Sequence, residues 1–117
     1  MKPLIYLASP YSHPNPAVVE QRFQDVSRAA AMMTQDGLMV FCPIAHSHPM
    51  AVYGGLTGNW EFWKAIDTEW IERCSELHLL MLPGWNTSTG VNAEVDIALK
   101  LGLPIFRRSP EEFGIHA

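Results

Sequence analysis

The chain has 117 residues, of which 48% are hydrophobic and 17% are charged, a balance typical of a globular domain. This length suits one domain, 1–117, and is too short for two. The net charge is −4 and basic residues form no cluster, which argues against binding a nucleic-acid polymer, since that requires many phosphate contacts. No stretch is apolar for long enough to cross a membrane or to form a signal peptide. We therefore expect a cytoplasmic protein.

The first third of the chain follows a strand–helix–strand pattern. The apolar run 4–8 predicts a buried strand, and the turn-rich residues after it end that strand. Asn15 as N-cap and Pro16 at the first helical position predict the start of a helix. Apolar residues recur at helical spacing until Gly37, after which 38–42 reads as a second strand.

The middle of the chain combines an expected loop with an aromatic helix. Residues 43–58 are rich in proline and glycine, and we expect a long connection there, of the kind that is often functional. A helix over about 59–74 follows, and Asp67 shares one of its faces with Trp63 and Trp70. A carboxylate on an aromatic stripe is unusual, because burying it without a partner is costly.

The last part of the chain predicts a second strand–helix–strand unit. The apolar run 77–82 reads as a strand, the turn and capping residues 83–90 follow, and a helix should run to Gly102 before a strand from Pro104. Two such units predict an α/β fold with a parallel sheet and right-handed crossovers. Glu94 lies about one turn into the helix, beyond the carboxyl end of a strand, where ligands bind in open α/β sheets.

Glu94 and Asp67 are the main candidates for chemistry. Glu94 has a structural explanation, because the helix dipole favours an acid in the first turns. As a catalytic group, the same field would keep the carboxylate ionised at neutral pH, which a nucleophile requires. Asp67 is either a buried acid satisfied by backbone donors or a second carboxylate facing a substrate. Two suitably spaced carboxylates are the minimum set for cleaving a glycosidic bond.

Further polar and aromatic residues follow the strand ends. Tyr6, Ser9 and Tyr11 lie at the end of the first strand and in its loop, at another edge of the same crevice, although Tyr6 could equally be a core residue. Trp85 could stack on a base or cover the core. The hydroxyls of residues 87–89, together with Gly90, could surround a phosphate at a helix N-terminus or form an ordinary cap.

His46 and His48 allow a metal interpretation, because alternate residues of an extended segment point the same way. No third ligand lies at the spacing of a metal site. We therefore expect no metal, and contact with a substrate or with the loop is the preferred role of both histidines.

Three motifs resemble the nucleoside 2-deoxyribosyltransferase superfamily over nearly the whole chain. They are Ile5-Tyr6-Leu7-Ala8-Ser9-Pro10, Asp67 on the middle helix, and Gly90-x-x-x-Glu94-x-x-x-Ala98-x-x-x-Gly102-x-Pro104. The last motif is the most specific. The Leu-Pro-Gly-Trp and His-Ser-His segments are most similar to a small bacterial branch of this superfamily.

The resemblance implies a flavodoxin-like three-layer sandwich with a mostly parallel sheet of four to five strands, and a reaction without a cofactor. Glu94 would attack C1′ of the deoxyribose, Asp67 would assist the departing base, and Tyr6 would lie beside the nucleophile. The partner would be a small-molecule nucleoside or nucleotide. The superfamily completes its pocket with residues of a neighbouring subunit, so a homo-oligomer, a dimer or tetramer, is expected.

Ser88 departs from the transferase pattern, in which an aspartate holds that place. A hydroxyl there is similar to the deoxynucleoside-monophosphate N-glycosidases, which hydrolyse nucleotides and contact their phosphate. The departure favours a phosphate-bearing substrate or simple hydrolysis over base transfer. It also leaves open a nucleotide-binding or sensing module without chemistry. A metal hydrolase built on His46 and His48 is a third possibility, which would require stoichiometric metal in the purified protein.

Overall fold

The computed structural model describes residues 2–56 and 59–116. Its strands are β1 (Leu4–Ala8), β2 (Met39–Phe41), β3 (Glu76–Leu80) and β4 (Ile105–Arg108). The helices within these residues are α1 (Pro16–Gln35), α2 (Pro43–Gly54), α3 (Trp60–Arg73) and α4 (Thr89–Lys100), followed by the 3₁₀ turn η1 (Pro110–Phe113).

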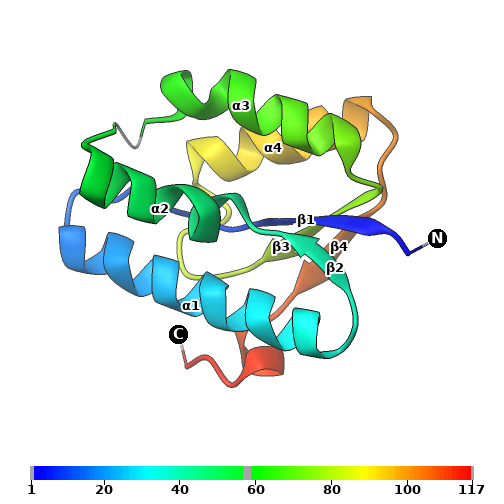
Figure 1. The fold of residues 1–117 in the computed structure, drawn as a ribbon, viewed down its shortest axis with the longest axis horizontal. Coiled ribbons are helices and arrows are strands. Elements are labelled where there is room, and N and C mark those ends of the chain that lie inside the picture. Colours follow the sequence, from blue (N-terminus) through cyan, green and yellow to red (C-terminus); the bar gives the residue numbers. More distant parts are fainter. Residues whose placement is uncertain (1, 57–58, 117) are drawn as a thin grey trace.

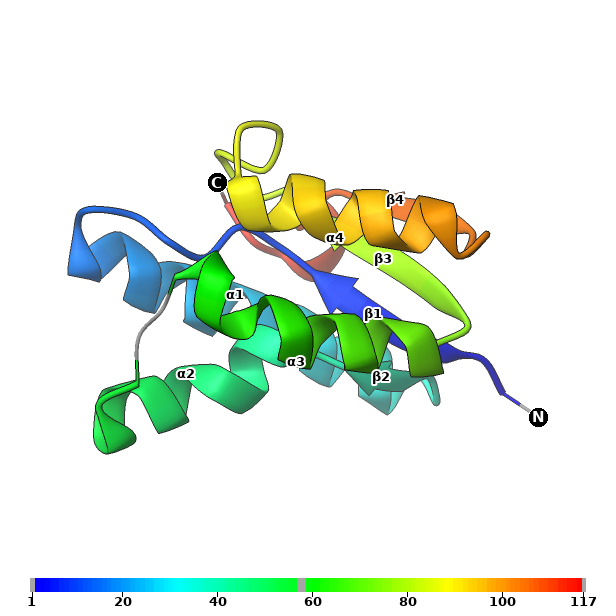
Figure 2. The ribbon, with the colours of Figure 1, turned by 90° about the horizontal axis from the view of Figure 1, so that it is seen from above.

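The four strands of the described residues form one parallel sheet in the order β2-β1-β3-β4. Helix α1 and η1 lie on one face of this sheet, and α3 and α4 lie on the other (Figures 1 and 2). This is the three-layer, flavodoxin-like α/β arrangement, and the prediction of a mostly parallel sheet of four to five strands is confirmed. Its central strands are β1 and β3, and the loops that follow these two strands lie at the candidate site.

Side-chain alternation along β1 separates two hydrophobic clusters. Ile5 and Leu7 pack with α1 and η1, whereas Tyr6 and Ala8 pack with α3 and α4. Successive strand residues point to opposite faces, so a tyrosine at the centre of the strand necessarily lies beneath the α3–α4 layer. Tyr6 is level with Leu77 of β3 and Phe41 of β2 in the strand register.

Local capping explains where the helices begin. The side chain of Asn15 accepts a hydrogen bond from the N–H of Ala17, with Pro16 at the first helical position. Asn59 caps α3 and Ser88 caps α4 in the same way. These caps satisfy N–H groups that have no partner inside the helix. The strands and helices expected from the sequence are therefore confirmed, except in the segment after β2.

The prediction of a loop over residues 43–58 is wrong for most of that segment, because Pro43–Gly54 is helix α2. Its proline and glycine residues act as helix ends: Pro43 occupies the first turn, and Gly55 closes the helix at φ 70°. Pro49 lies inside the helix, where it cannot donate a hydrogen bond. Residues 57 and 58, the end of the expected loop, lie outside the described residues.

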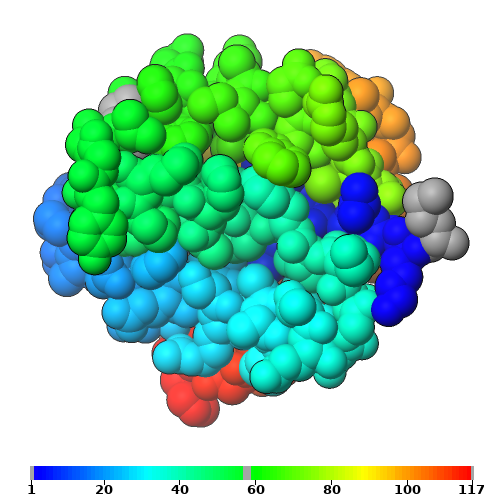
Figure 3. Space-filling view, viewed as in Figure 1, coloured from blue at the N-terminus to red at the C-terminus, as the bar shows by residue number. Residues whose placement is uncertain are grey.

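Helix α2 fills the space between α1 and α3 on the β2 side of the molecule, as the space-filling view shows (Figure 3). Cys42 and Cys74 are buried free thiols. None of the helices in the described part of the chain is long and apolar enough to cross a membrane.

Candidate active site

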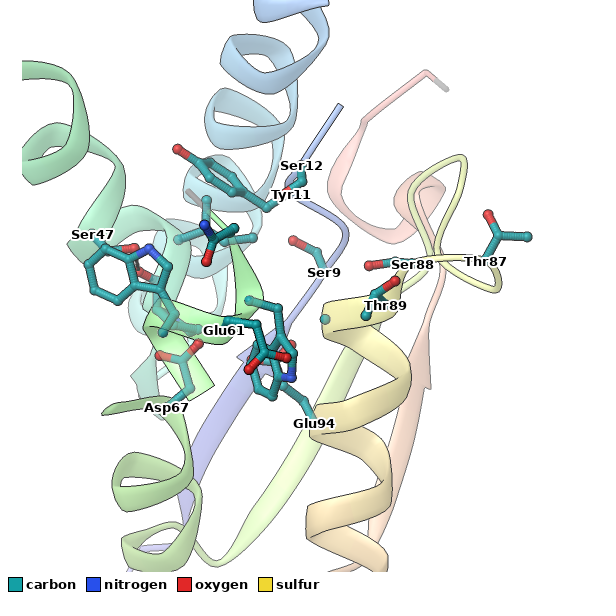
Figure 4. Close-up of a pocket in the computed structure, with 16 residues that line it drawn as sticks. Ser9, Tyr11, Ser12, Ser47, Glu61, Asp67, Thr87, Ser88, Thr89 and Glu94 are labelled. Atoms are coloured by element: carbon teal, nitrogen blue, oxygen red, sulfur yellow. Dashed lines mark hydrogen bonds between the residues drawn. The ribbon is translucent and has the colours of Figure 1, made fainter. Parts of the chain in front are cut away.

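A pocket of about 500 Å³ opens at the carboxyl ends of β1 and β3. Its walls come from the loop after β1, the first turns of α2 and α3, and the segment 87–94 that leads into α4. Asp67 on α3 and Glu94 on α4 project into it from opposite walls (Figure 4). The pocket thus lies where open parallel sheets bind ligands.

Glu94 is buried, with only 6% of its surface exposed, yet it borders the pocket. The hydroxyl of Tyr6, which is itself wholly buried in β1, donates a hydrogen bond to Oε2 of Glu94. Within residues 2–56 and 59–116, Glu94 forms no salt bridge. The carboxyl group is therefore held by a neutral phenol and not by a cation.

Burial raises the pKa of Glu94 from 4.5 to about 8, with the charge of Asp67 adding to the rise and the Tyr6 hydrogen bond opposing it. The expectation that the helix dipole keeps this group ionised at neutral pH is wrong. A dipole supplies roughly 0.3–1 kcal/mol, whereas each pKa unit corresponds to about 1.4 kcal/mol. Desolvation of the carboxylate outweighs the field of α4.

Asp67 faces the same pocket from the aromatic side of α3. Burial raises its pKa to about 6, and a hydrogen bond with Tyr6 works in the opposite direction. Burial, followed by the charges of Glu94 and Asp67, holds the pKa of Tyr6 well above its usual range. Tyr6 therefore remains a neutral phenol that interacts with both carboxyl groups.

The opposite rim of the pocket carries hydroxyl groups. Ser9 is 4% exposed, and its Oγ has no hydrogen-bond partner among the residues that the structure describes. An unsatisfied buried hydroxyl is costly and requires an explanation, and here a ligand in the pocket would supply the partner. Ser88 Oγ accepts a hydrogen bond from the Val91 N–H at 3.2 Å. Ser88 therefore caps α4 and also lines the pocket.

The structure brings most of the candidate residues together. Tyr6 lies beneath the pocket, and the following candidates line it: Ser9, Tyr11, Asp67, Ser88, Gly90 and Glu94. Three others, His46, His48 and Trp85, lie outside it. Trp85 packs against the core on the α4 side, and the guanidinium of Arg107 lies 5.7 Å from the centre of its ring. The structure thus favours the interpretation of Trp85 as a cover over the core.

His46 and His48 point to different neighbours, because side chains two residues apart on a helix diverge. His46 contacts Phe41 and Trp70, with ring centroids at 5.6 and 6.4 Å. His48 Nε2 donates to Glu20 Oε1 at 3.1 Å, and its Nδ1 lies 2.7 Å from the Tyr11 hydroxyl. The two rings do not converge as the metal interpretation requires. In the described part of the chain, no group of three histidine, cysteine or acidic residues could hold a metal ion.

The pocket also contains residues that the sequence did not single out. The first turn of α2 contributes Pro43, Ile44 and Ser47, and the start of α3 contributes Asn59, Trp60 and Glu61. The aromatic stripe of α3 was a signal for Trp60 and Trp63. The segment of α2 was expected to be a functional loop, but within it only His46 and His48 were candidates, and no signal pointed to Pro43, Ile44 or Ser47.

One protein-family model, described as "Domain of unknown function (DUF1937)", matches residues 3–109. The matched range includes the whole sheet and every residue that lines the pocket. A search of the curated proteins found no match.

Proposed function

We propose that this chain, which belongs to the DUF1937 family, cleaves the N-glycosidic bond of a (deoxy)nucleoside or of its 5′-monophosphate. One observation carries the proposal: a buried carboxyl group, Glu94, and a half-buried one, Asp67, line the same pocket, and a single phenol interacts with both. Paired carboxyl groups on either side of a scissile bond are the usual machinery of glycoside cleavage. The resemblance of the motifs around Tyr6, Asp67 and Glu94 points the same way.

In the proposed reaction, an oxygen of Glu94 attacks C1′ of the sugar and forms an ester bond. The C1′–N bond breaks, its electron pair goes to the base, and Asp67 delivers a proton to that base. Water then attacks C1′ and gives a proton to the Asp67 carboxylate, the bond between C1′ and the Glu94 oxygen breaks, and the sugar leaves with Glu94 ionised and Asp67 protonated again. A second base in place of water would complete a transfer. Direct attack followed by water predicts retention of configuration at C1′.

The pKa values of the two acids allow one of them to act as the nucleophile and the other as the proton donor. Between about pH 6 and about pH 8, the pair Asp67–Glu94 holds one proton. The productive arrangement places that proton on Asp67 and leaves Glu94 ionised, with the Tyr6 hydroxyl donating to it. Because the pKa of Glu94 is raised further than that of Asp67, the binding of substrate has to shift the proton from Glu94 to Asp67.

The two sides of the pocket suggest how a nucleotide would lie in it. Trp60 and Trp63 of α3 line the pocket, with Trp60 lying against Gly90 at the start of α4, and their rings suit the flat face of a base. Ser9, with its unpartnered hydroxyl, and the start of α4 form a rim of donors suited to the sugar or a 5′-phosphate. No lysine or arginine lines the described pocket, so hydroxyl and backbone N–H groups would hold such a phosphate.

The test is to incubate the protein with deoxynucleosides, ribonucleosides and their 5′-monophosphates and to measure free base by chromatography. We expect release from at least one substrate, and none with Glu94→Ala. A 2-fluoro sugar analogue should slow ester breakdown, so mass spectrometry should find one glycosyl group on a Glu94 peptide. Absence of free base from every substrate would contradict the proposal.

A nucleotide-binding or sensing module is the second candidate function. The observation that favours it is the raised pKa of Glu94, because a protonated carboxyl group can hold a ligand but cannot attack it. Calorimetry separates the two functions: tight binding of a nucleotide without turnover supports sensing.

The proposal further includes a cytoplasmic location, where nucleotide pools and reduced thiols such as Cys42 and Cys74 are found. It requires no cofactor, since side chains and water perform each step. The homo-oligomer, a dimer or tetramer, stays a prediction, which light scattering of the purified protein tests.

A further inference from the structure

We propose that Arg22 is a positioning residue that sets the width of the pocket by tying the loop after β1 to the loop after β3. Arg22 lies on α1, outside the pocket, and is half-buried. Its Nη1 donates to the carbonyl of Ser12 at 2.8 Å and, at 3.4 Å, to that of Tyr11. Its Nη2 donates to the carbonyl of Pro83 at 3.0 Å. One guanidinium group thus holds two segments that follow neighbouring strands.

Gly84 allows this close approach. It adopts φ +91°, and a Cβ added there would lie 2.7 Å from Nη2 of Arg22. A side chain at position 84 would therefore both strain the backbone and displace the guanidinium group. Gly102 has a similar φ of +75° but no heavy atom within 4 Å of an added Cβ. The requirement for space is specific to Gly84.

The two clamped segments continue directly into the pocket rim. Ser9, Tyr11 and Ser12 line one side, and residues 87–90 line the other (Figure 4). The reacting groups are held differently, because Tyr6 lies within β1 and Glu94 lies within α4. We therefore expect the clamp to control how well the rim grips the substrate, and to leave the alignment of Tyr6 and Glu94 unchanged.

A planar fork of donors is needed for this role. Arginine presents donors on separate nitrogens that diverge from a rigid plane, whereas lysine offers one compact ammonium group. Arg22→Lys keeps the positive charge, but the lysine should lose its hydrogen bond to one of the two loops. Arg28→Lys is the matched control, because Arg28 lies on the same helix and its salt bridge within the described residues is with Asp25, at 3.5 Å, and not with either loop.

The kinetic test rests on the proposed function. Arg22→Lys and Gly84→Ala should each raise KM about tenfold and leave kcat within about twofold, which is the pattern of lost uniform binding. The pH profile of kcat should not move, because neither substitution touches the two carboxyl groups. Arg28→Lys and Gly102→Ala should keep the wild-type KM, although Gly102→Ala should lower the melting temperature as Gly84→Ala does.

A second measurement needs no substrate. Hydrogen exchange of amides in residues 9–14 and 83–88 should be faster in Arg22→Lys than in the wild type and in Arg28→Lys. Unchanged exchange would overturn the clamp, and so would an unchanged KM in both Arg22→Lys and Gly84→Ala when the wild type is active. A wild type that releases no base, with exchange still faster in Arg22→Lys, would contradict the proposed function but support the clamp.

Discussion

The two faces of the sheet bury acidic groups in opposite ways. On the α3–α4 face, Glu94 and Asp67 both interact with the phenol of Tyr6, and burial raises the pKa of both. On the other face, beside β4, His78 Nε2 donates to Glu76 at 2.8 Å, and Arg108 Nη1 donates to His78 Nδ1 at 3.0 Å. Among the described residues, Glu94 and Asp67 form no salt bridge, whereas Glu76 pairs with a histidine that itself accepts from an arginine.

Glu112 shows the consequence of pairing. Partial burial pushes its pKa upward, but the hydrogen bonds from Arg108 and from the N–H of Ser109 outweigh this effect, and the net pKa is lowered. Arg108 Nε lies 2.9 Å from Glu112 Oε1. Paired acids of this kind fasten the C-terminal segment to the sheet. Unpaired acids beside a cavity cost stability, so the α3–α4 face is where a function would explain the cost.

The largest expected effect comes from replacing Glu94. Glu94→Gln should lower kcat/KM for base release by at least about a thousandfold, because the amide cannot act as a nucleophile. Its free energy of unfolding should match that of the wild type within about 1 kcal/mol at about pH 4, where both side chains are neutral and the amide can still accept the Tyr6 hydrogen bond. At pH 7 the variant should be the more stable protein by a few kcal/mol, because the buried acid of the wild type then has a raised pKa and the amide does not titrate. Glu112→Gln is the control from the paired face, and it should leave base release unchanged. Equal losses of base release in Glu94→Gln and Glu112→Gln would contradict the proposed difference between the two faces of the sheet.

The next effect concerns Asp67. Asp67→Asn should lower kcat roughly a hundredfold with an ordinary base, because the departing nitrogen loses its proton donor. With a base that leaves readily as an anion, the loss should be less than about tenfold. Both rates are measured by the same chromatographic assay. A loss of the same size with both bases would assign Asp67 a structural role.

Much of the fold could be predicted because it depends on local patterns. The β1 run, the Asn15–Pro16 helix start and the glycine after α4 each occupy a few consecutive residues, and the structure confirms them. Helix α2 could not be predicted in the same way. Its prolines and glycines also occur in loops, and its contacts with α1 and β1, which come from distant parts of the chain, help to stabilise it as a helix.

The candidate site, like the fold, could be predicted only where local patterns determine it. Helix spacing and the end of a strand placed Glu94 at the ligand-binding edge of the sheet. The same reasoning left Asp67 open between a buried acid and a second carboxylate, and only the motif resemblance suggested that the two act together; the structure places both at one pocket. The protonation of Glu94 could not, because its pKa depends on burial by several segments at once. The directions of His46 and His48 also depend on whether residues 43–54 are extended or helical.

The two faces should respond to pH with opposite signs. The pKa of Glu94 is raised on folding, so its contribution to stability is complete below about pH 4.5 and is lost as the pH rises through about 8. Relative to Glu94→Gln, the wild type should therefore lose a few kcal/mol over this range. The pKa of Glu112 is lowered, so its smaller contribution should be lost as the pH falls below about 4.5. Urea unfolding of both variants at several pH values measures the two slopes, and parallel slopes would contradict the comparison.

The smallest effect, and the most specific to the pocket face, is expected at Gly90. This glycine lies in the first turn of α4 without a positive φ, and an added Cβ would meet Trp60 and Ser88 only at 3.9 and 4.0 Å. Nothing in the protein therefore requires glycine there. Gly90→Ala should stabilise the fold by about 0.5 kcal/mol, because alanine is the better helix former.

The same methyl group would stand inside the pocket, so KM should rise by about threefold or more. Gly114→Ala is the matched control on the paired face: Gly114 has φ +68° and closes η1, so this change should cost stability and leave KM unaffected. A gain in melting temperature combined with a loss of affinity would mark Gly90 as a residue kept small for a ligand. A higher melting temperature without any loss of affinity would mean that the ligand does not reach the start of α4.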